Sequence, residues 1–263
     1  MQSVEMDPVP GVYSEAIAVG YESLVLATGA RELFLPFPGR TLPEVMGIGG
    51  VQALVKAGAS VAGRRVVIAG SGPLILPVAA TLAKAGARIV MVAEQAPGAA
   101  VRRFALGLWR QPGKIVEAAG LRASFATTRY RTGTWVASAS GDESVDRVIV
   151  TDGRRQREIA CDLLAASYGL VPNLELPRFL DCEVANFVVQ VDEEQRTSVD
   201  GVLAAGEICG IGGVDLALVE GRIAGLAAAA VEVPANLRSR RADLRRFAGS
   251  LAEAFRPRRE LFD

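Results

Sequence analysis

A glycine-rich turn at residues 70–73 is the segment whose residue types are best suited to binding a ligand. Gly70-Ser71-Gly72-Pro73 lies between the apolar run RRVVIA and a segment with helical spacing of apolar residues. In a dinucleotide-binding fold, the first glycine permits a tight turn and the second lets the backbone approach a pyrophosphate at the helix N-terminus. Glu94 ends the next apolar run, where a carboxylate would accept ribose hydroxyls and repel a 2′-phosphate. The pattern favours NAD, or another unphosphorylated adenosine ribose, over NADP.

The same loop departs from the full dinucleotide pattern. Ile75 occupies the third glycine position of G-x-G-x-x-G, and Ala79 could supply the close packing contact instead. Pro73 and Pro77 lie near the predicted helix start, where missing N–H groups matter least, but Pro77 could distort the first turn and weaken phosphate binding. The alternative is a plain strand-to-helix turn with Glu94 as a solvated surface charge.

A second glycine-rich segment follows residue 205. The run TSVDGVLAAGE, residues 197–207, ends in Gly206-Glu207 and is followed by Gly210, Gly212 and Gly213 before a long predicted helix. This order places a carboxylate beside a free helix N-terminus. Glu207 could bind a ribitol hydroxyl, and the helix dipole could stabilise electron density on a reduced flavin. The alternative is a glycine-rich turn that only caps the helix.

The composition restricts the remaining chemistry. The chain has no histidine, which excludes Ser/His and Cys/His pairs, imidazole proton relays and histidine metal sites. Cys161, Cys182 and Cys209 form no CxxC pair, zinc knuckle or iron–sulfur run, so we expect no metal and reduced, buried thiols in a cytoplasmic protein. Only Cys209 lies beside a predicted helix start, where a thiolate could be stabilised, and even there a buried structural thiol is expected. No side chain stands out as a base or nucleophile, so redox chemistry would belong to a cofactor.

Predicted strands and helices alternate along the chain and position both loops. Apolar runs that end at glycine predict the strands, and apolar residues at three- and four-residue spacing predict the helices. The expected strands are 21–28, 66–69, 88–93, 163–168, 188–191 and 201–205, with weaker ones at 121–126, 133–138 and 145–151. The expected helices are 49–59, 73–86, 214–231 and one near 110–119. Segments 31–45 and 151–162 have the turn residues of linkers between packed units.

The ends of the sequence and its charge lead to further expectations. Residues 1–10 lack the cationic start and apolar run of a signal peptide, and turn residues interrupt the apolar stretch 66–83, so neither secretion nor a membrane span is predicted. Basic and acidic residues balance at 29 each, which gives no overall attraction to nucleic acid. The tail predicts an amphipathic helix whose arginine-rich face contacts solvent or another subunit. Its apolar positions are Leu244, Phe247, Leu251 and Phe255.

Three motifs together resemble a known superfamily, the FAD-dependent pyridine nucleotide-disulfide oxidoreductases with two dinucleotide-binding domains. They are LVLATGA at 24–30, IAGSGP at 68–73 and TSVDGVLAAGE at 197–207. Within that superfamily, the stretches YGLVPNLEL, TSVDGVLAAGEICGIGGVDLALVEGRIAG and LAEAFRPRRELF are similar to the NAD/FAD-binding subunits of hydrogen cyanide synthase and opine oxidases. The Gly-Glu pair, where most members have Gly-Asp, is usual for this subgroup. The resemblance spans nearly the whole chain.

The resemblance implies an α/β fold in which a Rossmann-like NAD(P)-binding domain is inserted in a partial, three-layer FAD-binding domain. The implied bounds are 1–42 and 160–235 for the FAD-binding domain, 43–159 for the inserted domain, and 236–263 for a C-terminal helix and tail. The implied activity is flavin-dependent dehydrogenation of an amine or amino acid, together with a partner that is a second oxidoreductase subunit. The candidate cofactor-binding residues are Thr28, Gly29, Ala30, Gly206, Glu207 and Val214 for FAD, and Gly70, Ser71, Gly72, Pro73 and Glu94 for NAD or ATP.

This chain differs from those relatives at both ends. Relatives begin with a βαβ unit whose own G-x-G-x-x-G holds the FAD pyrophosphate, and the 20 residues before Tyr21 lack that fingerprint. Relatives often continue into a cysteine-rich iron–sulfur domain, whereas this sequence ends at Asp263. We therefore expect FAD binding to need a partner or an N-terminal piece encoded elsewhere. The alternatives are a non-catalytic module that binds NAD or ATP, and a truncated, inactive relative.

Overall fold

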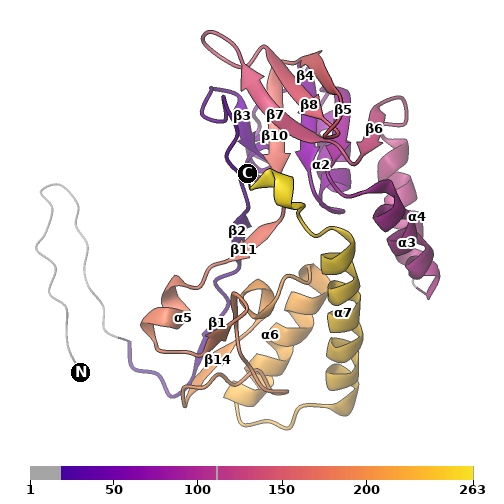
Figure 1. Cartoon of the computed structure of the whole chain (residues 1–263). Helices are drawn as coiled ribbons and strands as arrows, with labels where there is room; N and C mark the ends of the chain where they lie inside the picture. The colour runs from indigo at the N-terminus through magenta and orange to yellow at the C-terminus, as the bar shows by residue number, and fades with distance from the viewer. Residues whose placement is uncertain (1–18, 111, 263) are drawn as a thin grey trace, which may run out of the picture.

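The computed structural model describes residues 19–110 and 112–262 of the chain. Three sequence expectations fall partly outside the described residues: the start 1–18 of the expected FAD-binding segment, position 111 of the helix near 110–119, and position 263 of the tail. Figure 1 shows two packed parts. We call residues 45–167 the upper unit, and residues 19–32 together with 170–254 the lower unit.

The upper unit is built on a five-stranded parallel sheet in the order β3-β10-β4-β5-β6. Gly70 at the end of β4 lies opposite Glu94 at the end of β5, so the glycine loop and this carboxylate share one edge of the sheet. The strands are β3 (Val45–Gly47), β4 (Arg65–Gly70), β5 (Arg88–Glu94), β6 (Arg129–Thr132) and β10 (Leu163–Ser167).

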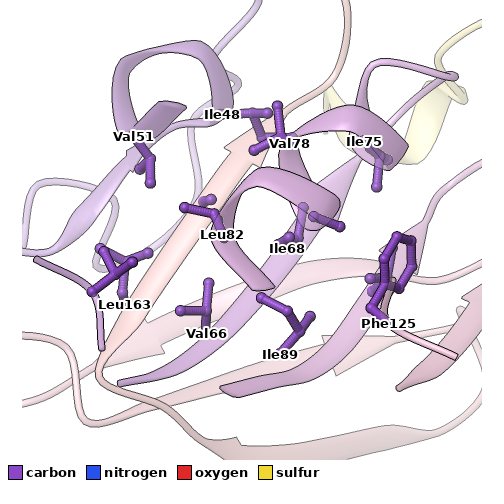
Figure 2. Packing of buried hydrophobic residues seen from close by; sticks show 14 residues of the cluster. Ile48, Val51, Val66, Ile68, Ile75, Val78, Leu82, Ile89, Phe125 and Leu163 are labelled. Atoms are coloured by element: carbon purple, nitrogen blue, oxygen red, sulfur yellow. The ribbon is translucent and has the colours of Figure 1, made fainter. Parts of the chain in front are cut away.

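Both faces of this sheet are covered, because successive side chains of a strand point to opposite sides. Val66 and Ile68 of β4 pack against helices α1 and α2, as Figure 2 shows. Val67 and Ala69 pack against the antiparallel sheet β7-β8-β9. The parallel sheet is therefore the middle of three layers, which explains why β4 is apolar on both faces. The outer elements are α1 (Ile48–Lys56), α2 (Ile75–Lys84), β7 (Trp135–Ser140), β8 (Arg147–Thr151) and β9 (Gln156–Ala160).

The lower unit holds a short parallel pair, β1 and β14, with α6 and α7 beside it (Figure 1). Strand β2, through which the chain leaves the lower unit, and strand β11, through which it returns, run side by side as an antiparallel pair. The elements are β1 (Leu24–Leu26), β2 (Ala30–Glu32), β11 (Leu170–Pro172), α5 (Glu175–Phe179), β12 (Val184–Ala185), β13 (Val188–Val189), β14 (Val202–Ala204), η2 (Gly206–Cys209), α6 (Val214–Ala228) and α7 (Ala235–Ala254). After α7 the chain returns to the upper unit and forms the 3₁₀ turn η3 (Arg259–Leu261).

The α/β fold with a Rossmann-like parallel unit is confirmed, but several elements differ from the prediction. The weak strand expected at 121–126 is wrong: it covers the end of α4 (Pro112–Ala123) and a turn, since the local sequence is rich in the helix formers Ala, Leu and Arg. Strand β6 reads RYRT and has no apolar run to reveal it. Helix α3 (Gly98–Gly107) and the 3₁₀ turn η1 (Leu108–Arg110) were not predicted, and α3 has no fully buried residue among those described.

The domain boundaries stay predictions, although one strand bears on them. β10 pairs along its whole length with β4, from Leu163 opposite Val66 to Ser167 opposite Gly70. A boundary after residue 159 would assign β10 to a different domain from β3 and β4, the strands with which its backbone is hydrogen-bonded. The pairing favours a boundary after residue 167.

Replacement of Gly70 by alanine should destabilise the upper unit. A Cβ at this position would lie 1.8 Å from the backbone oxygen of Ser167, so β4 and β10 would have to separate. We expect Gly70→Ala to lower the free energy of unfolding by about 1–3 kcal/mol in urea titrations. Gly50→Ala is the control: a Cβ at this exposed position of α1 meets no atom within 4 Å, so it should raise stability by up to about 1 kcal/mol. Equal stability of the two variants would contradict the close strand approach.

Candidate cofactor-binding site

The two loops expected to bind FAD lie at the same edge of the lower unit. β1 and β14 are parallel neighbours with Leu26 opposite Ala204, so both strands end at this edge. The N–H of Ala205 donates to the carbonyl oxygen of Leu26 at 2.9 Å and continues the pairing beyond the strands. Residues 28–30 follow the end of β1 after one intervening residue, and residues 206–207 follow the end of β14 after one intervening residue. The fold therefore brings together the LVLATGA and AAGE motifs at the carboxyl ends of adjacent strands, where open α/β sheets bind ligands.

Glu207 links this edge to the start of α6. Its Oε1 accepts a hydrogen bond from the N–H of Gly213 at 2.9 Å, and its Oε2 accepts one from Gly212 at 3.3 Å. Burial raises the pKa of this half-buried carboxyl, and the two backbone donors act in the opposite direction. Glu207 thus stabilises the glycine-rich turn before α6, while no described side chain caps the first turn of the helix itself. A carboxylate has about four lone-pair sites, so a ligand hydroxyl could still donate to it.

The turn after β1 is held by a residue that sequence reasoning did not single out. The Thr28 hydroxyl donates to the carbonyl oxygen of Asn173 at 2.9 Å, and the Asn173 side-chain amide donates to the carbonyl oxygen of Thr28 at 2.8 Å. Gly29 has φ +66°, and a Cβ there would meet no protein atom within 4 Å. The turn is therefore fixed from one side and open at Gly29. Asn173 belongs to the YGLVPNLEL stretch, and the similarity of that stretch to the relatives was the only indication of this residue in the sequence.

Glu220 is a second residue that the sequence reasoning missed. Its side chain is 1% exposed, and its Oε2 accepts a hydrogen bond from the N–H of Gly206 at 3.0 Å. Its Oε1 lies 2.8 Å from Nη2 of Arg245 and 3.6 Å from Nε of Arg241, both on α7. The expectation that the arginines of the tail helix meet solvent or another subunit is therefore wrong for Arg241, whose side chain is 11% exposed, whereas Arg245 keeps 37% of its side chain exposed while it pairs with Glu220. A buried carboxylate requires cationic or hydrogen-bonding partners, and α7 supplies them.

The glycine loop forms the expected tight turn, but its backbone donors are already engaged. Gly72 has φ +93°, a conformation that favours glycine. The N–H of Ser71 donates to the carbonyl oxygen of Ser167 at 3.0 Å, and that of Gly72 donates to Oε2 of Glu94 at 2.8 Å. Pro73 has no N–H. In this conformation, positions 71–73 therefore offer no free backbone donor to a phosphate.

Glu94 is buried and holds the loop. Its side chain is 0% exposed, and Oε1 accepts a hydrogen bond from the N–H of Ala96 at 2.7 Å, beside the Gly72 bond to Oε2. Burial raises the pKa of this carboxyl to about 7, against the opposite effect of the two amides. The alternative that Glu94 is a solvated surface charge is wrong. Its role toward a ribose hydroxyl stays a prediction.

The cysteines give no sign of catalytic chemistry. Cys161, Cys182 and Cys209 are free and buried. Burial raises the pKa of the Cys209 thiol to about 12, so this group is a neutral thiol at physiological pH. Within residues 19–110 and 112–262, no group of three or more His, Cys, Asp or Glu side chains could hold a metal ion. In the same residues, we find no helix with the length and apolar character that a membrane crossing requires.

Glu94 should make the chain less stable as the pH rises toward neutrality. Its pKa is about 7 in the folded chain and about 4.3 in an unfolded chain, so the folded state holds the extra proton between these values. This contribution to the free energy of unfolding is fully present below about pH 4 and is lost as the pH rises through about 7, by at most about 1.4 kcal/mol per pH unit.

Urea unfolding across this pH range measures the effect. The difference between the wild type and Glu94→Gln should change with pH in that window. Glu158→Gln, which removes an exposed carboxyl, is the control. Its free energy of unfolding should depend on pH in the same way as that of the wild type. Parallel profiles for the wild type and Glu94→Gln would contradict the raised pKa.

The curated relatives of this chain include two groups of oxidoreductase subunits. The chain is 32% identical to HcnB, a hydrogen cyanide synthase subunit of Pseudomonas protegens, over 224 residues, which cover 79% of this chain and 48% of the relative. It is 30% identical to an opine oxidase subunit of Agrobacterium tumefaciens over 257 residues, which cover 90% of this chain and 50% of the relative. The chain thus spans about half the length of these relatives.

Solved structures share the fold. An FAD-dependent pyridine nucleotide-disulphide oxidoreductase from Desulfovibrio vulgaris superposes with a TM-score of 0.61 at 23% identity, covering 82% of this chain and 55% of the other. A family model of the pyridine nucleotide-disulphide oxidoreductases matches residues 4–232. These matches confirm the resemblance that the three sequence motifs indicated. The chain belongs to the pyridine nucleotide-disulphide oxidoreductase family.

Proposed function

We propose that this chain is the cofactor-binding part of a flavin-dependent oxidoreductase, with FAD at the edge formed by β1 and β14. One observation carries the proposal: residues 28–30 and 206–207 meet at this edge, with the Glu207 carboxylate beside the N-terminus of α6. When bound, the flavin would supply the electron transfer. The protein's part is to bind and orient it.

The residues at this edge fit such a role. Gly29 leaves open space where any other residue would place a Cβ. Thr28 and Ala30 flank it, and Asn173 fixes the backbone of the turn. Glu207 would accept a hydroxyl of the cofactor while it retains its amide donors. The N-terminus of α6, where the Val214 side chain is 71% exposed, would stabilise negative charge through the helix dipole.

The second nucleotide, NAD or ATP, is assigned to the loop Gly70–Pro73 of the upper unit. The strand, loop, helix and strand of a nucleotide-binding βαβ unit are all present there, in parallel register. Glu94 lies at the correct strand end for an adenosine ribose, but its carboxylate now binds Gly72 and Ala96. The loop would therefore have to rearrange when it binds a pyrophosphate.

Substrate and partner come from the relatives alone. Those relatives are named as subunits of hydrogen cyanide synthase and opine oxidase. By extension, the substrate of this protein is an amine or amino acid, and a second oxidoreductase subunit supplies much of the substrate site. We also propose that the protein is cytoplasmic, in keeping with its three free cysteines.

Flavin titration tests the proposed FAD site. The chain, alone or with its partner subunit, should shift the absorbance of FAD, and an amine or amino-acid substrate should bleach the bound flavin under anaerobic conditions. Glu207→Ala should weaken FAD binding by about tenfold or more, since a hydrogen bond to a charged group contributes about 1.5–3 kcal/mol. Glu232→Ala, an exposed carboxyl beyond α6, is the control. The FAD proposal fails if the wild type shows no flavin shift with or without the partner.

The alternative is a non-catalytic module that binds an adenine nucleotide. The upper unit favours it, because this unit has two hydrophobic clusters of its own on either side of the parallel sheet. Calorimetry with NAD, NADP and ATP measures such binding. We expect heat from NAD or ATP and a weaker signal from NADP, whose 2′-phosphate would meet Glu94. Nucleotide binding without any flavin binding would favour this alternative, and only dilution heats for all three would exclude a nucleotide site.

A further inference from the structure

The segment that follows α7 returns from the lower unit to the glycine loop. We call residues 255–261 the strap. In Figure 1 the strap is the yellow stretch that leaves the top of α7 and runs to the parallel sheet near β10. Neither motif analysis nor the proposed FAD site assigns a role to it.

The strap binds the glycine loop through its main chain. The Ser71 hydroxyl donates to the carbonyl oxygen of Phe255 at 2.8 Å. The side-chain amide of Gln95 donates to the carbonyl oxygens of Phe255 and Arg256 at 3.3 and 3.2 Å, and its Oε1 accepts from the N–H of Arg258 at 3.2 Å. Gln95 is 0% exposed and also donates to Ser71 at 2.8 Å. The buried Gln95 amide thus hydrogen-bonds the strap with both its NH₂ group and its carbonyl oxygen.

Side chains anchor the strap on either side of these bonds. The Arg258 guanidinium lies 4.2 Å from the centroid of the Trp135 ring. Leu261 is buried in a cluster with Trp135 and Tyr168, and the Phe255 ring meets Phe104 of α3 edge-on at 5.3 Å. The strap is therefore docked at three places on the upper unit.

These contacts lie where a nucleotide would bind. Ser71 belongs to the loop after β4, and Gln95 directly follows Glu94 at the end of β5. In open α/β sheets, nucleotides bind in the crevice at these carboxyl ends. The second glycine of such a loop is the one that lets the backbone approach a pyrophosphate, and a Cβ on Gly72 would lie 3.8 Å from the Phe255 ring. The strap thus occupies the space beside the loop. The N–H of Gly72 is not free for a phosphate either, because it donates to the Glu94 carboxylate.

We propose that the strap is an autoinhibitory contact: while it is docked, it holds the glycine loop closed, and a nucleotide binds only after it is released. This inference rests on the proposed nucleotide site. Only the fraction of molecules whose strap is released can bind nucleotide. The smaller that fraction is, the weaker the apparent affinity for nucleotide becomes, in direct proportion. The expected ligand is an adenine nucleotide with a diphosphate, for which NAD and ATP are the probes.

Release of the strap should increase nucleotide affinity. Leu261→Asp places a charge in the apolar cluster of Trp135 and Tyr168, which disfavours docking and leaves the loop unchanged. Phe262→Asp is the matched control, because the neighbouring Phe262 side chain is 60% exposed. Calorimetry with NAD and ATP should give a dissociation constant at least about tenfold lower for Leu261→Asp than for the wild type and the control. Arg258→Ala, which removes the contact with Trp135, should shift affinity in the same direction.

A second measurement uses the unmodified chain. Saturating NAD or ATP should speed tryptic cleavage after Arg258, since the nucleotide-bound form has a released strap. Equal nucleotide affinity of the wild type, Leu261→Asp and Phe262→Asp, together with unchanged cleavage, would overturn the strap proposal and leave the nucleotide site intact. Absence of nucleotide binding in every variant would overturn both.

Discussion

The buried carboxylate of Glu220 is the interaction on which the arrangement of the lower unit depends. It receives the N–H of Gly206 on one oxygen and the guanidinium groups of α7 on the other. Removal of a carboxylate from water costs several kcal/mol, and hydrogen-bonding and cationic partners of this kind offset that cost. One side chain of α6 therefore fixes both the turn at the proposed flavin site and the direction of α7. The strap continues from α7. The ion pairs between Glu220 and α7 therefore also set where residues 255–261 reach the upper unit.

The two carboxylates that the sequence indicated as ligands for sugar hydroxyls share one structural feature. Glu94 binds the amides of Gly72 and Ala96, and Glu207 binds those of Gly212 and Gly213. Each carboxylate thus first stabilises the glycine-rich turn beside it. They differ in burial: Glu207 is half-buried and keeps access to a ligand, whereas Glu94 is enclosed together with Gln95. The proposed flavin site is open at Glu207, and the proposed nucleotide site is closed by its own loop and by the strap.

The sequence patterns predicted elements where one local signal dominated. β4 and β5 are continuous apolar runs that end at Gly70 and Glu94, and a long run buried on both faces is typical of a parallel sheet. The sequence patterns did not predict features that depend on contacts between distant segments. β6 has the polar sequence RYRT, yet it pairs with β5 because the sheet offers it backbone partners. Arg241 is a charged residue at a position of the apolar face of α7, four residues after Leu237 and three before Leu244, and it is 9% exposed there because it pairs with Glu220.

The sequence by itself determined the α/β class, the glycine loop, the 28–30 and 206–207 motifs and the family, because these depend on short stretches with characteristic residues. Only the tertiary structure decided which distant groups meet. Glu94 faces the amide of Gly72, Glu220 faces α7, and Gln95 faces the backbone of the strap. These partners are far apart along the chain and include backbone atoms, whose positions no residue type reveals. A buried polar group must find a partner when the chain folds, and only the folded chain shows which one it finds.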